Sequence, residues 1–269
     1  MSEEQIHQTF RWLFAIRDVV ISKADIKKGD KIIDIGCGSG LLGFGIIEKF
    51  QDDVEVIFSD KFEDCLEECK KLLSECEVKY NASFLQSDCL NIKLPDFSVD
   101  KAMTRSVLVH ITDKQKAINE ICRILKKGGI YSAFEPIIKS NTRYHELTNP
   151  DEITDWQAFK EAEDEFMSDM NDPLVNFDAQ SIANNLDLAG FSDGDVDVCD
   201  TPSTYIATKD AIKQWFISAP SPDRPTSKER FLKYFDEEKV NKYIEEMQNA
   251  LHNKMITVNS KTVFIRAIK

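Results

Sequence analysis

The sequence predicts an α/β fold: a doubly wound, mostly parallel sheet of seven strands with helical cap insertions. Two observations support this prediction. Short apolar runs alternate with helical apolar patterns from residue 31 to residue 136, and three alternating glycines directly follow the first run. Strands that alternate with helices favour a parallel sheet, because two parallel strands must be joined by a crossover segment, usually a helix.

The expected strands are short apolar segments bounded by glycine or polar residues. They are residues 31–35, 54–58, 82–86, 99–104, 129–134, 196–199 and 261–268. Helical periodicity is present in residues 6–22, 40–50, 62–76, 113–125, 212–217 and 237–251, and a further helix is expected from Phe177-Asp178 to Ala189-Gly-Phe191. Lys126-Lys-Gly-Gly129 predicts a turn that ends helix 113–125, since glycine readily adopts the left-handed backbone conformation.

The alternation stops after residue 136, which indicates insertions. Residues 137–176 contain no strand candidate, many carboxylates and few core-forming positions, so we expect a first lid insertion there. Residues 209–257 are expected to form a second, helical insertion, and residues 1–28 an N-terminal helical cap. The core is then expected to comprise residues 29–136, 177–208 and 258–269.

The glycine turn is the most informative motif. Gly36, Gly38 and Gly40 alternate directly after the first strand, and Asp34 lies just before them. A strand, a tight glycine turn and a helix together bring backbone close to a nucleotide-like ligand. The phase differs from the dinucleotide fingerprint G-x-G-x-x-G, because Leu41 occupies the place of its third glycine.

The pattern D-x-G-x-G-x-G resembles the first motif of the class I S-adenosylmethionine-dependent methyltransferases. Leu94-Pro-Asp-Phe-Ser-Val-Asp100 resembles the family's approach to its fourth strand, and Arg123-Ile-Leu-Lys-Lys-Gly-Gly129 resembles its turn before the fifth. The resemblance covers residues 30–136 well and 177–269 loosely. It implies a Rossmann-like cofactor-binding core with an antiparallel last strand, S-adenosyl-L-methionine as cofactor and S-adenosyl-L-homocysteine as product.

The resemblance also implies the cofactor-binding residues. Asp60 matches the acidic residue that accepts hydrogen bonds from the ribose hydroxyls, and one carboxylate can accept both. Asp88 matches the residue that meets the adenine amino group, with the backbone N–H of Cys89 on a ring nitrogen. Without the glycine motif, an aspartate after a strand is more often a helix cap or a solvated loop residue. The complete expected set is Asp34, Gly36, Cys37, Gly38, Gly40, Asp60, Lys61, Asp88, Cys89 and Arg105.

Catalytic groups are expected at the carboxyl ends of the fourth and fifth strands, where open parallel sheets bind ligands. Arg105, His110 and Glu135 are the candidates. An arginine near a cationic sulfonium is costly unless an anion offsets it. Arg105 therefore either binds an anionic acceptor or forms a structural pair with Glu135. His110 either acts as a general base or has a capping and packing role.

Aromatic residues outside the motifs are candidates for an acceptor pocket. Both insertions leave the sheet on the side where a lid forms. Aromatic residues at helical spacing are, however, more often core than ligand contacts. The candidates are Trp12, Tyr144, Trp156, Tyr205 and Trp215.

Composition restricts the possible partners and the cellular compartment. The net charge of -13 disfavours a nucleic acid partner, because phosphate binding needs a basic face. No run of 18 apolar residues is present, so no membrane partner is expected. Seven scattered cysteines favour the cytoplasm over a disulfide framework. Cys65, Cys69 and Cys76 share a predicted helix, but they lack metal-ligand spacing, so no metal is expected.

The sequence therefore predicts a methyltransferase that acts on a small molecule by in-line displacement, as a monomer or homodimer. Three alternatives remain open: a peptide or protein acceptor, a non-catalytic cofactor-binding module of the same fold, and a dinucleotide-dependent oxidoreductase. The identity of the acceptor and the atom that is methylated are not readable from the sequence.

Overall fold

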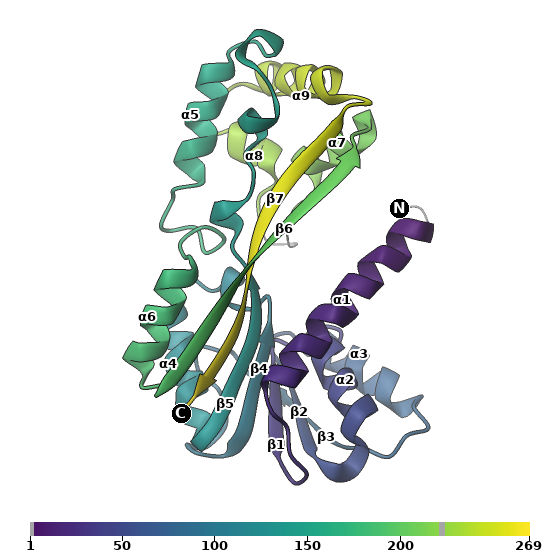
Figure 1. The fold of residues 1–269 in the computed structure, drawn as a ribbon, viewed down its shortest axis with the longest axis vertical. Helices are drawn as coiled ribbons and strands as arrows, with labels where there is room; N and C mark the ends of the chain where they lie inside the picture. Colours follow the sequence, from purple (N-terminus) through teal and green to yellow (C-terminus); the bar gives the residue numbers. More distant parts are fainter. Residues whose placement is uncertain (1–2, 221–223) are drawn as a thin grey trace. The chain divides into compact units, whose positions relative to one another are not determined.

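The computed structural model describes residues 3–220 and 224–269. Its strands are β1 (Lys31–Ile35), β2 (Glu55–Asp60), β3 (Asn81–Gln86), β4 (Val99–Arg105), β5 (Leu125–Pro136), β6 (Asp193–Ile206) and β7 (Met255–Ile268). Its α-helices are α1 (Glu3–Lys23), α2 (Leu41–Phe50), α3 (Glu63–Ser74), α4 (Lys114–Ile124), α5 (Trp156–Phe166), α6 (Ala179–Ala189), α7 (Lys209–Ile217), α8 (Ser227–Phe231) and α9 (Glu237–Leu251). The strands form one sheet in the order β3-β2-β1-β4-β5-β7-β6 (Figure 1).

The sheet is parallel except at β7. β1 pairs in parallel with β2 and β4, β2 pairs with β3, and β4 pairs with β5. β7 runs antiparallel to β5, with Phe264 opposite Phe134. The predicted fold class is confirmed, including the antiparallel last strand. The strand order reverses between β1 and β4, and open α/β sheets bind ligands beyond the carboxyl ends of the strands at such a point.

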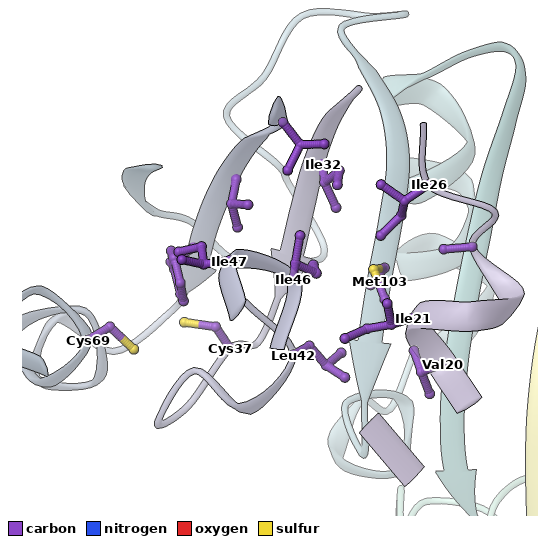
Figure 2. Close-up of a cluster of buried hydrophobic side chains, with 14 of the residues drawn as sticks. Val20, Ile21, Ile26, Ile32, Cys37, Leu42, Ile46, Ile47, Cys69 and Met103 are labelled. Carbon is purple, nitrogen blue, oxygen red and sulfur yellow. The ribbon is translucent and has the colours of Figure 1, made fainter. Parts of the chain in front are cut away.

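Both faces of the parallel strands are covered by helices. On one face, Ile32 of β1 and Met103 of β4 belong to a buried cluster with Val20 of α1 and Ile46 of α2 (Figure 2). Ile33, which alternates to the other face, is also fully buried. There α4 packs against α6 and β5. Burial on both faces explains why the first strand is a continuous apolar run rather than an alternating one.

β6 and β7 are longer than the sequence predicts. The expected segments were 196–199 and 261–268, whereas each strand has 14 residues. Ser192 N donates to Ile268 O, and Ala207 N donates to Lys254 O, so the two strands are antiparallel neighbours. Most side chains of β6 are exposed. Backbone pairing therefore defines this strand, and no apolar alternation marks its ends in the sequence.

The turn expected after helix 113–125 has a different structure. α4 ends at Ile124, and Leu125 is already extended and paired with Val99. The register then shifts, so that the next residue pair is Lys101 with Ile130. Gly128 does adopt a left-handed conformation, with φ of 74°. Gly128 therefore lies in the irregular part of β5, where the register shifts, and does not form a helix C-cap. The predicted start of the strand at residue 129 is wrong, because β5 begins at Leu125.

The chain divides into two compact units. The first comprises the described parts of 1–136, 177–199 and 262–269, and the second comprises those of 137–176 and 200–261. The residues expected to form the N-terminal cap belong to the first unit. The division falls inside β6 and β7, not at the insertion boundaries expected at 209 and 257.

The second unit has its own aromatic core. Phe159 of α5 stacks on Tyr243 of α9, with ring centroids 3.9 Å apart, and both side chains are buried. Ala162 and Phe166 of α5 also lie in this core. The expectation that residues 137–176 offer few core positions is wrong. The buried residues of α5 follow a helical spacing that the intervening carboxylates obscure in the sequence.

Two glycines in α2 provide a matched test of packing. A Cβ on Gly43 would lie 2.2 Å from a ring carbon of Phe58, which is fully buried. A Cβ on Gly45 would lie 2.5 Å from Arg17 Cδ and 2.9 Å from Ile21 Cδ1, in aliphatic side chains that have more rotamers than the ring of Phe58. Gly43→Ala should lower the free energy of unfolding by about 1–3 kcal/mol, as overpacking does.

Gly45→Ala should have a smaller effect or a stabilising one, because alanine favours a helix over glycine by about 1 kcal/mol. Urea unfolding of both variants and the wild type measures the difference. Equal losses in the two variants would contradict the packing of α2 on Phe58.

Candidate functional site

The glycine turn between β1 and α2 has the backbone that the sequence predicts. Gly36, Gly38 and Gly40 have φ of 65°, 51° and 80°, which side chains rarely tolerate. A Cβ on Gly36 would lie 2.6 Å from Val107 Cγ2, so the turn packs directly on the segment after β4. A Cβ on Gly38 would meet nothing within 4 Å. The backbone at Gly38 is therefore open to a ligand.

Two aspartates hold this turn through backbone hydrogen bonds. Asp60, at the end of β2, accepts from Gly38 N at 2.9 Å and from Phe62 N at 3.0 Å. Asp34, in β1, accepts from Gly43 N in the first turn of α2 at 2.9 Å. Asp34 is 2% exposed and Asp60 is 7% exposed. Each carboxylate oxygen keeps a second lone pair, so Asp60 can order the turn and still accept ligand hydroxyls.

Asp34 has an unusual charge state for an aspartate. Burial raises its pKa to about 7, and neither the hydrogen bond from Gly43 nor the positive charge of Arg105 cancels this effect. Its role in the structure is to join β1 to α2.

A hollow of about 260 Å³ lies beyond the ends of β2 and β3. It is lined by Lys61, Gln86, Ser87, Asp88, Asn91 and Lys93. Lys61 Nζ lies 3.8 Å from Asp88 Oδ2, and Asp88 Oδ1 accepts from Leu90 N. Cys89 is buried, which raises the pKa of its thiol to about 12. Lys61 and Asp88, both predicted to bind the cofactor, therefore line one cavity.

Glu135 holds the segment that follows β4 through hydrogen bonds and does not form an ion pair with Arg105. It is fully buried at the end of β5 and accepts from the N–H groups of Val107 and Leu108, each at 2.9 Å, and of Val109 at 3.0 Å. Burial raises its pKa to about 7 against these three bonds. The proposed structural pair of Arg105 and Glu135 is absent, because both carboxylate oxygens face the backbone of the following turn.

Arg105 lies at the carboxyl end of β4 and has no carboxylate within 4 Å in the described part of the chain. Strand alternation places it on the same face as Met103, above Asp34 on the neighbouring strand. Its partner in the β4–β5 register is Phe134, and the ring of Trp12 lies edge-on to Phe134 at 6.0 Å. Trp12 is 48% exposed. A cation and an aromatic side chain thus flank the end of the sheet.

His110 does not open the next helix. It ends a short 3-10 turn, Leu108–His110, and α4 begins only at Lys114. The helix cap is Asp113, whose carboxylate accepts from Lys116 N at 2.9 Å. The capping role considered for His110 is therefore wrong.

The other predicted aromatic residues belong to the second unit, where they pack on one another. The Tyr144 hydroxyl donates to Trp215 O at 3.0 Å, and its ring stacks on Trp215 at 6.3 Å. Tyr205 meets Trp215 edge-on, and Trp156 meets His145 edge-on. Burial raises the pKa of Tyr144 to about 12. These contacts support a packing role for Tyr144 and Trp215, and a substrate role for the four residues stays a prediction.

The site in the first unit fits the predicted cofactor. It offers open backbone at Gly38, free lone pairs on Asp60 and a cavity at Asp88. Within the described residues, no group of three or more His, Cys, Asp or Glu side chains is arranged to hold a metal ion. No helix in the described ranges is long and apolar enough to cross a bilayer. Sequence reasoning did not find Val107, because its contact with Gly36 comes from a different strand.

A family model described as a methyltransferase domain matches residues 26–172, more than half of the chain. The chain belongs to this family. The ubiquinone/menaquinone biosynthesis C-methyltransferase UbiE of Francisella tularensis subsp. novicida is 31% identical over 109 residues, which cover 40% of this chain and 44% of that protein. The sterol 24-C-methyltransferase erg6 of Aspergillus fumigatus is 31% identical over 110 residues, which cover 41% of this chain and 29% of that protein. The chain thus spans less than half the length of these relatives.

Solved structures share the fold at low identity. The YcgJ protein from Bacillus subtilis has a TM-score of 0.60 at 17% identity, covering 95% of this chain and 98% of that chain. Phosphoethanolamine N-methyltransferase 2 of Haemonchus contortus, in complex with phosphomonomethylethanolamine and S-adenosylhomocysteine, has a TM-score of 0.55 at 19% identity, covering 96% and 53%. The cyclase SpnF has a TM-score of 0.53 at 15% identity, covering 94% and 80%. These likenesses concern the fold alone.

Asp60 should be essential for cofactor binding. Asp60→Ala removes the acceptor for Gly38 N and for the ribose hydroxyls, so affinity for S-adenosylhomocysteine should fall by about tenfold or more. Asp64→Ala, at an exposed position in α3, is the matched control and should bind like the wild type. Titration calorimetry measures both. Wild-type affinity in Asp60→Ala would contradict this assignment.

Asp34 should make stability depend on pH. Its pKa of about 7 in the folded chain exceeds the ordinary value of 3.8, so between these values the folded state binds more protons than the unfolded state. The free energy of unfolding should therefore fall as pH rises through this window, by up to about 1.4 kcal/mol per pH unit for this one group, and then level off.

Asp34→Asn keeps an acceptor for Gly43 N but cannot titrate, so its unfolding free energy should fall less steeply from pH 5 to pH 7. The raised pKa of Glu135 gives the same pH dependence of the unfolding free energy in the wild type and in Asp34→Asn. The difference between their two slopes therefore comes from Asp34. Urea unfolding across this range, with the exposed Asp53→Asn as control, measures the slopes. Identical slopes for wild type and Asp34→Asn would rule out the proton on Asp34.

Proposed function

We propose that the protein transfers a methyl group from S-adenosylmethionine to a small-molecule acceptor that carries an anionic group. The observation that supports methyl transfer is the glycine turn, held by Asp60 and open at Gly38, in a chain of the methyltransferase domain family. The observation that supports an anionic acceptor is Arg105, which has no carboxylate partner in the described residues.

The residues of the chain have separate roles in this proposal. S-adenosylmethionine supplies a methyl group on a cationic sulfonium, which an in-line nucleophile displaces. Asp60 accepts the ribose hydroxyls, and the backbone of the turn carries the cofactor at Gly38. Asp88 and the N–H of Cys89 bind the adenine. Cys37 helps to order the turn, since its N–H donates to Ser59 O at 3.0 Å.

Arg105 determines what the acceptor must provide. A second cation close to the sulfonium is unfavourable unless an anion lies between or beside them. Glu135 does not supply that anion, because its oxygens accept three backbone N–H groups. A carboxylate, phosphate or phenolate on a bound molecule would. Trp12, which is half exposed, offers apolar surface for the rest of the acceptor, and His110 is the candidate proton acceptor after β4.

The proposal also covers the cellular compartment, the oligomeric state and the lid. The seven cysteines are all free thiols, which supports a reducing compartment such as the cytoplasm. We expect a monomer or homodimer, and we expect residues 137–176 to close over the bound acceptor.

Transfer of a tritiated methyl group tests the function. The purified chain is incubated with methyl-labelled S-adenosylmethionine and, in turn, a sterol, an unmethylated hydroquinone and phosphomonomethylethanolamine. We expect labelled product with an anionic or ionisable acceptor and none with the neutral sterol. Absence of S-adenosylhomocysteine binding would contradict the whole proposal, and transfer to the sterol alone would contradict the anionic acceptor.

Arg105→Lys should lower turnover by about tenfold or more, because a point charge cannot reproduce the two parallel hydrogen bonds of a guanidinium. Binding of two ligands shows whether Arg105 contacts the carboxylate of the cofactor or an anionic group of the acceptor. S-adenosylhomocysteine carries a carboxylate, and methylthioadenosine does not. If Arg105 binds the acceptor, both should bind Arg105→Lys as they bind the wild type, and only turnover should fall.

Selective loss of S-adenosylhomocysteine affinity in Arg105→Lys would instead assign Arg105 to the cofactor carboxylate and contradict its role toward the acceptor. Unchanged turnover would contradict both roles. Thermal melting of Arg105→Lys verifies that it is folded.

A further inference from the structure

Two cysteine thiols meet at the glycine turn. Cys37 lies inside the turn, and Cys69 lies on α3. The Sγ atoms of Cys69 and Cys37 lie 3.3 Å and 3.8 Å from the same backbone oxygen, Gly38 O. Figure 2 shows the two sulfur atoms on the facing sides of their residues. Within the described residues, no other two cysteines donate to the same backbone oxygen.

The pair is positioned at the open part of the turn. Cys69 is fully buried, and Cys37 is 8% exposed. A Cβ on the neighbouring Gly40 would lie 3.0 Å from Cys69 Sγ, so α3 packs closely on the turn. The neighbouring thiol of Cys37 lowers the pKa of Cys69, and the thiol of Cys69 raises the pKa of Cys37. One thiolate beside one thiol is the arrangement that disulfide formation requires.

We propose that Cys37 and Cys69 form a reversible disulfide that lowers cofactor affinity, so that the glycine turn is a site of oxidative modification. The oxidant is a peroxide. One thiolate attacks a peroxide oxygen, which breaks the O–O bond and gives a sulfenic acid and hydroxide; the hydroxide takes up the proton that the thiol released and becomes water. The second thiol then displaces the sulfenic hydroxyl as water, and the S–S bond forms. The two thiols lose two protons and two electrons, and one hydrogen peroxide becomes two waters.

The disulfide acts on the cofactor through Gly38. Its carbonyl oxygen accepts from both thiols and loses these S–H donors when the bond forms, and the two sulfurs must come to about 2.05 Å from each other. The turn is therefore displaced at the residue whose N–H is bound by Asp60 and whose surface is open to the ligand. By linkage, a bound cofactor also opposes the oxidation. This consequence depends on the proposed function, whereas the formation of the disulfide does not.

The test treats the reduced, cofactor-free protein with hydrogen peroxide. Intact mass spectrometry should show the loss of two hydrogens, and peptide mapping without reductant should join the peptides that contain Cys37 and Cys69. Calorimetry should show that affinity for S-adenosylhomocysteine falls by about tenfold or more and returns with dithiothreitol. Added S-adenosylhomocysteine should slow the cross-link. Binding by the reduced protein, measured first, tests the proposed function separately.

Cys69→Ala should lose the cross-link and keep its affinity after peroxide treatment, and Cys65→Ala, on the same helix, should behave like the wild type. Because Cys69 is buried, peptide mapping of the wild type is decisive if Cys69→Ala does not fold. A wild type that forms no Cys37–Cys69 bond, or that forms it with unchanged affinity in a protein that binds when reduced, would overturn the proposal.

Discussion

Hydrogen bonds from backbone N–H groups to buried carboxylates are the interactions on which this site depends. Asp60 fixes Gly38, and Asp34 fixes Gly43, so both ends of the glycine turn are tied to neighbouring strands. The turn needs this support because its glycines lose more conformational freedom on folding than other residues. The cost is visible at Asp34, since burial raises its pKa to about 7. The geometry of the turn is therefore set before any ligand binds.

Glu135 orders the segment after β4 in the same way, by accepting backbone N–H groups. Three N–H groups converge on it, which orders residues 107–109 and places Val107 against Gly36. The same bonds keep Glu135 away from Arg105. One buried acid therefore orders the segment after β4 and does not neutralise the half-buried Arg105. This separation is the structural basis for proposing an anionic acceptor, because an arginine that forms no ion pair within the described residues, at the edge of a cationic cofactor site, requires a compensating charge.

The second unit is stabilised by an aromatic core and by a buried glutamate that accepts hydrogen bonds. Its aromatic core surrounds Glu163, which accepts from Tyr144 N and from His145 Nδ1, each at 2.9 Å. Burial raises the pKa of Glu163, and the three hydrogen bonds that it accepts oppose that shift. The polar sequence of residues 137–176 thus conceals a folded unit rather than an extended flap. Three of the aromatic residues predicted to line a pocket, Tyr144, Trp156 and Trp215, are partly buried and pack against this core.

The sequence alone determined the parallel sheet and the glycine turn, because both depend on local signals: apolar runs, their spacing and glycines at fixed positions. Asp34, Asp60 and Asp88 were predicted for the same reason, since Asp34 lies near the end of β1, Asp60 ends β2 and Asp88 lies two residues after β3. Only the tertiary structure decided the partners of Glu135, the contact of Cys37 with Cys69 and the length of β6. These features join residues far apart in the chain or rest on backbone pairing between exposed strands, and neither leaves a periodic pattern in the sequence.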